Sequence, residues 1–423
     1  MKLDKPILVI SFSIALSVPV LAQAAAFGIY DPRSLGMGGV GVTIATARNA
    51  SFFNPAMLSA TREDDDFALG VPIVAARAND PDKALDDIDA LETSGDDLSN
   101  TLRAFDAAPT APNATAAASS LAVFNTDLNK ISNKVLDADV FAGAILTIPS
   151  KKFGVGVHVS GRANFGAKFV FAGTDQALIS GLATDLNQCA ADPVGNAANC
   201  TSAQATVDAD GQITNLQSRL LVRGLALSEA GLAFARRFGS AGNTDIGITL
   251  KAQRIRTYDY AISTQETEID TRRGERNENS ANIDLGIAKA FGESYKAGLV
   301  VKNVLRKEFI TVLGNKIELK PQARLGMSHH RSWGNIGIDL DLTKNKPVAE
   351  GFDKETRFVA VGAEIDVFST LQLRLGYRHD LAGNYDGMPS VGLGFSPFGV
   401  HIDAAIAGND KEMAAGVQLG FNF

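Results

Sequence analysis

The chain has 423 residues, of which 45% are apolar, and it is rich in glycine (40) and phenylalanine (23) but holds a single tryptophan. Its formal net charge is −7 with no basic stripe, which argues against nucleic acid as a partner. No Pro/Ser-rich linker divides the chain, so one large barrel accounts for its length as well as two or three soluble domains would.

Residues 1–24 have the features of a secretory signal peptide. Lys2 and Lys5 supply the positive start, an apolar stretch covers 7–16, and Ala22-Gln23-Ala24 is a small-residue cleavage pattern. No later run approaches the roughly eighteen apolar residues that a membrane helix needs. We therefore expect export across the inner membrane and cleavage near Ala24.

Residues 25–66 are predicted to form an N-terminal hatch rather than ordinary strands or helices. The stretch 30–58 is rich in glycine, which permits positive φ and close backbone approach, so that the segment can coil tightly in a confined space. It also carries two adjacent apolar anchors and an Asn-Pro-Ala end. The residues expected to matter are Arg33, Gly36, Gly38, Gly39, Phe52, Phe53, Asn54 and Pro55.

The glycines at 36–41 also invite a nucleotide-binding interpretation. A dinucleotide fingerprint must follow a buried strand and open a helix, whereas here a leader and a Tyr-Asp-Pro turn precede the glycines. We therefore favour the hatch.

From residue 67 onward the dominant hydrophobic period is two, which is typical of β-strands with one apolar and one polar face. A soluble sandwich gives the same alternation, but three segments approach twenty residues, where soluble strands usually have five or six. Such lengths suit strands that tilt through a bilayer. The predicted strands are 67–77, 139–148, 153–171, 218–238, 244–266, 277–291, 295–306, 318–331, 334–344, 355–367, 370–380, 389–396, 398–407 and 413–423.

Fourteen strands make the even number that a bacterial barrel requires. Connections after even-numbered strands are short and those after odd-numbered strands are mostly long, which predicts periplasmic turns and external loops. The last strand alternates strictly up to Phe423 and resembles the terminal strand that the barrel-assembly machinery recognises. On this parity the hatch begins on the periplasmic side.

Two long insertions fall on the predicted external side. Residues 80–138 are helical by period, in two segments around an Ala/Pro/Thr-rich spacer at 107–117, and they are expected to cap the barrel mouth. Residues 173–215 hold a short helix at 176–186 and a loop that Cys189 and Cys200 are expected to close. That disulfide is worth roughly 3 kcal/mol in the chain-entropy model, and nearby ligands for a metal or redox role are lacking.

A third external loop, 271–279, is dense in alternating charge and is expected to be solvated. The polar faces of the strands carry charges of mixed sign that would meet across the lumen. They either pair around the hatch or line a hydrated path, and we favour pairing because buried charges need partners. The residues are Lys251, Asp284, Arg324, Asp339, Asp341, Glu364, Asp366, Arg374 and Arg378.

No constellation for catalysis or metal binding stands out. His329 and His330 are adjacent on a strand and so point to opposite faces, and a girdle position beside Trp333 explains them better than a metal. No Gly-x-Ser-x-Gly element is present. A hydrolase at the barrel rim remains an alternative only if scattered Asp, His and Ser residues converge in space. We expect no cofactor and no enzyme activity.

Three stretches carry a resemblance to a known family: 33–56, then 229–260, then 320–377 with its KPQARLGM, VAVGAEID and LRLGYRH segments. They look like the TraF-like subgroup, labelled conjugal transfer proteins, of the FadL-like outer-membrane barrels. FadL itself is matched only in the hatch, the barrel size and the aromatic end. The resemblance implies hydrophobic substrates and release by hatch movement, while the TraF label implies mating-pair or secretion machinery.

We therefore predict an all-β, transmembrane antiparallel up-and-down β-barrel in the outer membrane of a Gram-negative bacterium. Its predicted function is a gated passive channel for a small hydrophobic or amphipathic solute. The alternative is a surface scaffold or receptor of a conjugation or secretion apparatus. The expected partners are the lipid bilayer, the barrel-assembly machinery, a hydrophobic ligand and transfer or secretion proteins.

Overall fold

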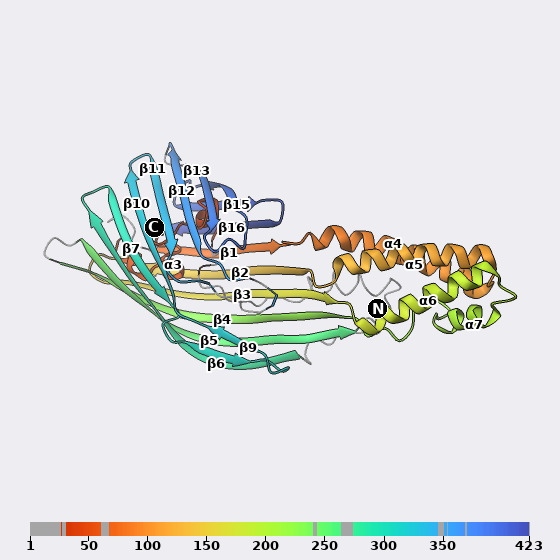
Figure 1. Cartoon of the computed structure of the whole chain (residues 1–423). Coiled ribbons are helices and arrows are strands. Elements are labelled where there is room, and N and C mark those ends of the chain that lie inside the picture. Colours follow the sequence, from red (N-terminus) through yellow and green to blue (C-terminus); the bar gives the residue numbers. More distant parts are fainter. Residues whose placement is uncertain are drawn as a thin grey trace.

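The protein is a closed barrel of fourteen antiparallel strands from which a group of helices projects at one end (Figure 1). The computed structural model describes residues 27, 31–60, 67–239, 243–263, 274–345, 351–352, 354–368 and 370–422. The predicted leader at 1–24 and the terminal Phe423 lie outside these residues. Around the barrel the strands run β1-β16-β15-β14-β13-β12-β11-β10-β7-β6-β5-β4-β3-β2. The predicted fold class and strand number are confirmed.

Each strand follows its neighbour in the chain, as in an up-and-down barrel, and β1 pairs with β16 to close it. The barrel strands are β1 (Ala68–Asn79), β2 (Val135–Ile148), β3 (Gly154–Val170), β4 (Arg219–Phe238), β5 (Thr244–Ser263), β6 (Glu275–Phe291), β7 (Tyr295–Lys302), β10 (Gln322–Arg331), β11 (Gly334–Asp341), β12 (Phe358–Val367), β13 (Leu371–Asp380), β14 (Met388–Phe395), β15 (Val400–Gly408) and β16 (Glu412–Asn422).

The alternation of residue types explains the two faces of the wall. In β13, Leu373 and Leu375 are exposed on the outside, whereas Arg374 and Arg378 are buried in the lumen. The same inversion of a soluble protein's pattern holds in β5, where Leu250 is exposed and Lys251 is buried. Exposed apolar and buried charged residues are what a barrel in lipid requires.

No helix among the described residues is long and apolar enough to cross a membrane.

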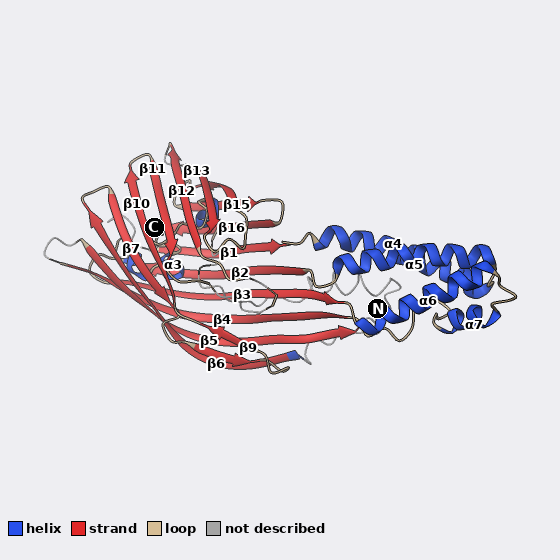
Figure 2. Ribbon diagram, in the orientation of Figure 1, coloured by secondary structure: helices blue, strands red, loops and turns tan. Residues whose placement is uncertain are grey.

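The two ends of the barrel differ in their connections. All connections after β2, β4, β6, β10, β12 and β14 are short, and we call this the turn end. At the opposite end, the arm end, most connections are longer and two include the helices, although the one between β15 and β16 is short. Figure 2 shows that β3 to β6 reach farther toward the helices than β11 to β13 do. Strands β4 and β5 have 20 residues each, against 8 in β11 and in β14, so the wall is much taller on one side.

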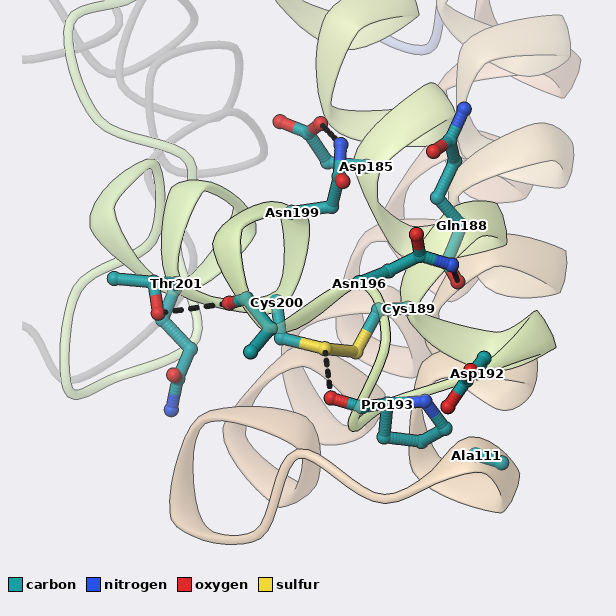
Figure 3. The surroundings of a disulfide bond; sticks show 12 residues. Ala111, Asp185, Gln188, Cys189, Asp192, Pro193, Asn196, Asn199, Cys200 and Thr201 are labelled. Atoms are coloured by element: carbon teal, nitrogen blue, oxygen red, sulfur yellow. Dashed lines mark hydrogen bonds between the residues drawn. A yellow bond between two sulfur atoms is a disulfide. The ribbon is translucent and has the colours of Figure 1, made fainter.

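The helices form an arm with its own apolar core. The arm consists of α4 (Ala84–Ala107), α5 (Ala111–Ile131), α6 (Gly173–Ala191) and α7 (Ala197–Ala205). Leucines of α4, α5 and α6 interdigitate in a single buried cluster. A disulfide between Cys189 and Cys200 ties α6 to α7 (Figure 3). The arm is thus built from two connections, with α4 and α5 between β1 and β2, and α6 and α7 between β3 and β4.

Several predicted bounds in the insertions were wrong. The spacer at 107–117 is only three residues long, because Pro112 is tolerated in the first turn of α5 and alanine favours helix. The short helix at 176–186 is part of the 19-residue α6. The loop at 271–279 is partly strand, since β6 begins at Glu275.

The predicted strands 295–306 and 318–331 also needed correction. Strand β7 ends at Lys302, because Asn303 adopts φ 53° and breaks the extended run. Residues 307–319 fold as a separate hairpin, β8 (Lys307–Ile310) and β9 (Lys316–Leu319). Period-two alternation shows that a segment is a strand but does not show which sheet it joins.

Candidate functional site

The N-terminal segment 31–60 lies inside the barrel, and we call it the plug. Its first helix, α2 (Pro32–Gly36), contacts β13 to β16 on one side of the lumen. Its last turn, η1 (Pro55–Leu58), contacts β3 to β6 on the other side. Almost every residue between them is buried. The plug therefore crosses the lumen from wall to wall.

Short-range capping fixes the path of the plug. Asp31 caps α2 by accepting a hydrogen bond from the Ser34 amide at 3.0 Å, and Pro32 occupies the first helical position. Gly38 and Gly39 have φ of 73° and 96°, which reverses the chain after one helical turn. Asn54 caps η1 through the Ala56 amide at 3.1 Å. These turns compact the segment without regular secondary structure of ordinary length.

A belt of glycines on the lumenal wall lets the plug backbone approach the sheet. A Cβ built on Gly376 would lie 2.1 Å from the Gly38 nitrogen, and one on Gly362 would lie 2.3 Å from the Met37 oxygen. Gly337 pairs with Gly362, which pairs with Gly376, so the belt is continuous across three strands. The wall glycines whose added Cβ would lie within 3.4 Å of a plug atom are Gly70, Gly143, Gly154, Gly156, Gly247, Gly286, Gly298, Gly326, Gly337, Gly362, Gly376, Gly392 and Gly420.

A buried ionic network holds the α2 end. Arg33 forms a bidentate pair with Glu364, with nitrogen–oxygen distances of 2.8 and 2.6 Å, and donates to the Ile44 carbonyl. Glu364 also accepts from Arg374 at 2.7 Å, and Arg374 donates to Asp403 at 2.7 Å. All four side chains are at most 7% exposed. Two arginines and two carboxylates balance one another, so the charge of the plug is neutralised by the wall.

Wall side chains also bind the main chain of the plug. Asp339 accepts from the amides of Gly41 and Val42 at 2.8 and 3.0 Å. The Ser390 hydroxyl accepts from the Gly38 amide at 3.0 Å, and Lys302 donates to the Phe52 carbonyl. The contacts with Asp339 satisfy amides of the plug that lie outside its helices.

The remaining predicted lumenal charges are likewise buried among partners. Arg324 donates to Asp341 at 2.6 Å, and Lys251 pairs with Asp284 at 2.8 Å. Arg378 donates to Glu412 at 2.6 Å near the arm end. Asp366 differs, because it is partly exposed near the turn end, where Gln372 donates to it at 2.8 Å. In the described part of the lumen, these charges therefore form ion pairs and do not line an open hydrated path.

Phe52 and Phe53 anchor the far end of the plug. Phe53 is 2% exposed in a cluster with Met57 and Leu58. Phe52 packs edge-on against Phe141, with ring centroids 5.4 Å apart, and against His158 at 4.9 Å. His158 faces Glu229, with Nε2 3.5 Å from the carboxylate.

A cavity of about 480 Å³ separates part of the plug from the wall near the 292–294 turn. We call it the vestibule. Plug residues from Thr43 to Arg48 form one side, and Lys296, His330 and His401 lie on the other. Its lining mixes charged with small apolar side chains, and its volume is that of a small-molecule site.

The hairpin β8–β9 covers the inner face of the tall wall at the arm end. Phe309, Ile317 and Leu319 pack on Leu225, Leu227 and Ile255. Its other side carries an ion-pair network, in which hydrogen bonds from Lys320 and Arg306 lower the pKa of Glu318 to about 2. That carboxylate therefore stays ionised at any ordinary pH.

Within the described residues, no group of three or more His, Cys, Asp or Glu side chains is placed to hold a metal ion. His329 stacks near Tyr295 at 4.5 Å, while His330 contacts Asn335, so the two rings serve different neighbours.

Sequence reasoning missed several residues of the site. Glu229, Asp403 and Glu412 complete ionic networks, and the wall glycines form a belt against the plug; neither feature was predicted. A signal was present, because glycine recurs at lumenal positions in strands that are otherwise alternately aliphatic and charged.

Comparison with known proteins gives both a family and a fold. A family model described as "F plasmid transfer operon, TraF, protein" matches residues 51–341. The toluene transporter TbuX of Ralstonia pickettii is 11% identical over 94% of this chain and 99% of its own, with a TM-score of 0.52. A FadL homologue of Pseudomonas aeruginosa is 10% identical over 96% and 100%, also with a TM-score of 0.52. No curated protein sequence matches the chain. The structural likeness confirms the predicted FadL-like barrel.

Proposed function

This chain belongs to the family described as "F plasmid transfer operon, TraF, protein" and has a FadL-like barrel fold. We propose that it is a gated passive channel of the Gram-negative outer membrane. Its solute is small and hydrophobic or amphipathic. The turn end faces the periplasm and the arm end faces outside, since long connections of such barrels are external. Residues 25–66 act as the hatch, and the leader 1–24 is removed on export.

The observation that carries this proposal is a lumen filled by a non-covalently held plug. The plug is seated by hydrogen bonds and ion pairs to the wall, such as Arg33 to Glu364, which can break and re-form. A vestibule of about 480 Å³ already lies beside it. The two solved neighbours named above are a toluene transporter and a FadL homologue, which supports a hydrophobic solute.

Uptake into liposomes tests the channel. We expect vesicles containing the mature chain to take up toluene faster than empty vesicles and to leave a neutral disaccharide outside. Deleting residues 27–60 removes the plug, so planar bilayers should then show steady ionic conductance that the intact chain lacks. A chain that neither speeds toluene entry nor conducts after the deletion is not a channel.

The arm favours a second candidate function, a surface scaffold for transfer or secretion proteins. Its helices pack on one another rather than over the barrel lumen, as Figure 1 shows, and the disulfide stabilises its distal part. A rigid projection with its own core is suited to holding a partner, in keeping with the family description.

Removing the arm separates the two candidates. Residues 82–133 and 174–216 are each replaced by an Asn-Gly turn in the same variant. Both must be removed together, because α4, α5 and α6 share one apolar core and removing one helix would expose the apolar side chains of the others. A channel keeps its toluene uptake without the arm, and a scaffold loses cross-links to neighbouring proteins in cells. Unchanged cross-links would contradict the scaffold, and lost uptake would show that the arm belongs to the channel.

A further inference from the structure

Two phenylalanines at the turn end have backbone conformations that their residue type disfavours. Phe368 has φ 55° between β12 and β13, and Phe398 has φ 52° between β14 and β15. Among the described residues, the other non-glycine positions with positive φ are one lysine and three asparagines, and asparagine tolerates this region. Two phenylalanines in neighbouring hairpins therefore need an explanation.

The turns themselves call for small or polar residues. The Val400 amide donates to the Pro397 carbonyl at 3.0 Å, and the two residues between, Phe398 and Gly399, both have positive φ. This is the type I′ arrangement, in which Asn, Asp or Gly is the usual first residue. The Thr370 amide closes the other turn by donating to Val367 at 3.3 Å. A phenylalanine with left-handed backbone angles is therefore strained at either position.

Neither side chain is buried within the protein in a way that offsets this strain. Phe368 is 93% exposed and Phe398 is fully exposed, so neither ring is buried on the protein. Burying a phenylalanine ring removes a large apolar area from water, which offsets the strain of a left-handed backbone. An apolar surface outside the chain is therefore the environment that makes these residues favourable.

The surroundings indicate which surface this is. Partly exposed aromatic residues occur around the whole turn end, at or beside nearly every turn; they are Phe153, Phe238, Phe291, Tyr295, Trp333 and Phe395. Two of them carry a cation over the ring, with Arg236 5.3 Å from the centroid of Phe238 and Lys289 5.5 Å from that of Phe291. Aromatic residues that encircle the barrel, with cations beside them, match the headgroup layer of a membrane, which also surrounds the barrel. A binding site for a protein partner would instead gather such residues on one side.

We propose that Phe368 and Phe398 insert into the headgroup region of the periplasmic leaflet and anchor the short-stranded side of the barrel. This inference rests on the membrane location in the proposed function. The circle of aromatic residues at the turn end would then include the tips of two turns as well as the wall. These turns connect the short strands β12 to β15, which have only 8 to 10 residues each. The partner is phospholipid, and the contact sets the height of this side in the bilayer.

Tryptophan fluorescence tests the proposal, because Trp333 is the only tryptophan and lies on the same ring. Three chains combine Trp333→Phe with Phe368→Trp, Phe398→Trp or Leu313→Trp, the last at the exposed tip of hairpin β8–β9 at the arm end. In vesicles whose lipids carry bromine at shallow acyl positions, we expect the probes at 368 and 398 to be quenched by lipid at least twofold more than the probe at 313. Aqueous iodide should quench only the last.

The native Trp333 distinguishes the possible failures. If Trp333 is quenched by lipid but the probes at 368 and 398 respond only to iodide, the turn tips are in water and the proposal is overturned. If Trp333 also responds only to iodide, the barrel is not in the bilayer, and the proposed function fails with it.

A second variant avoids placing tryptophan in a strained turn. The double change Phe368→Asn and Phe398→Asn relieves the strain and removes the apolar rings. In vesicles we expect the unfolding equilibrium constant to rise about tenfold, because the lost burial exceeds the strain relieved. Leu381→Asn at an arm-end turn is the matched control and should change it little. Unchanged or greater stability of the double variant would overturn the proposal.

Discussion

Replacing Gly376 with valine is expected to unseat the plug and leave the channel open. A Cβ at this position would lie 2.1 Å from the Gly38 nitrogen and 2.2 Å from the Met37 carbonyl carbon, and both are main-chain atoms that cannot rotate away. Overpacking of this kind costs about 3 kcal/mol, which would raise the open population about a hundredfold. Single-channel recording in planar bilayers measures this as open probability.

Leu375→Val on the same strand is the matched control. Leu375 faces outward and is 64% exposed, so this change alters the wall without touching the plug. Its open probability should equal that of the native chain. If Gly376→Val also stays closed while remaining folded, close backbone contact at the glycine belt does not hold the plug.

Replacing Glu364 with glutamine is expected to have the second large effect. The carboxylate accepts from both Arg33 and Arg374, and all three side chains are buried. Glutamine leaves two buried arginines with one fewer negative charge between them. Removing one partner of a buried ion pair costs about 3–5 kcal/mol, so the open probability should rise at least about a hundredfold.

The comparison with Arg33→Met makes this prediction specific. Without Arg33, Glu364 keeps its bonds from Arg374 at 2.7 Å and from Asn335 at 3.0 Å, so no buried charge is stranded. We expect a smaller rise in open probability than for Glu364→Gln. Glu355→Gln removes a partly exposed partner of Lys344 outside the plug contacts and should have no effect. The reverse order of Arg33→Met and Glu364→Gln would show that the plug is not held by charge pairing on the wall.

Much of the barrel could be predicted from local pattern. Alternation in segments such as 371–378 indicates a strand with one apolar face. Because side chains in a strand alternate between the two faces, the sequence also shows which residues share that face. Strand number and the parity of short and long connections followed from the same pattern. The hairpin at 307–319 was not predicted. Its residues alternate as strongly as those of the barrel strands, but β8 and β9 pair with each other and not with the barrel wall.

The helices were predicted less well than the strands. In α6, glycine, threonine and serine weaken the helical signal, yet Ile179, Leu182 and Leu186 are held in the core of the arm, where α6 packs against α5. Helices of this kind take their stability from tertiary contact rather than from propensity. Their bounds therefore depend on neighbours that lie far away in the sequence.

The sequence alone determined that this protein is a lipid-facing barrel of fourteen strands with a glycine-rich segment at its start, because strand alternation is a local property. Which charges pair, and how closely the plug approaches the wall, depend on contacts made only in the folded barrel. Arg33 and Glu364 are 331 positions apart, and Gly38 meets Gly376 only once the barrel has closed. Such pairings depend on register and closure around the whole ring, which no window of sequence contains.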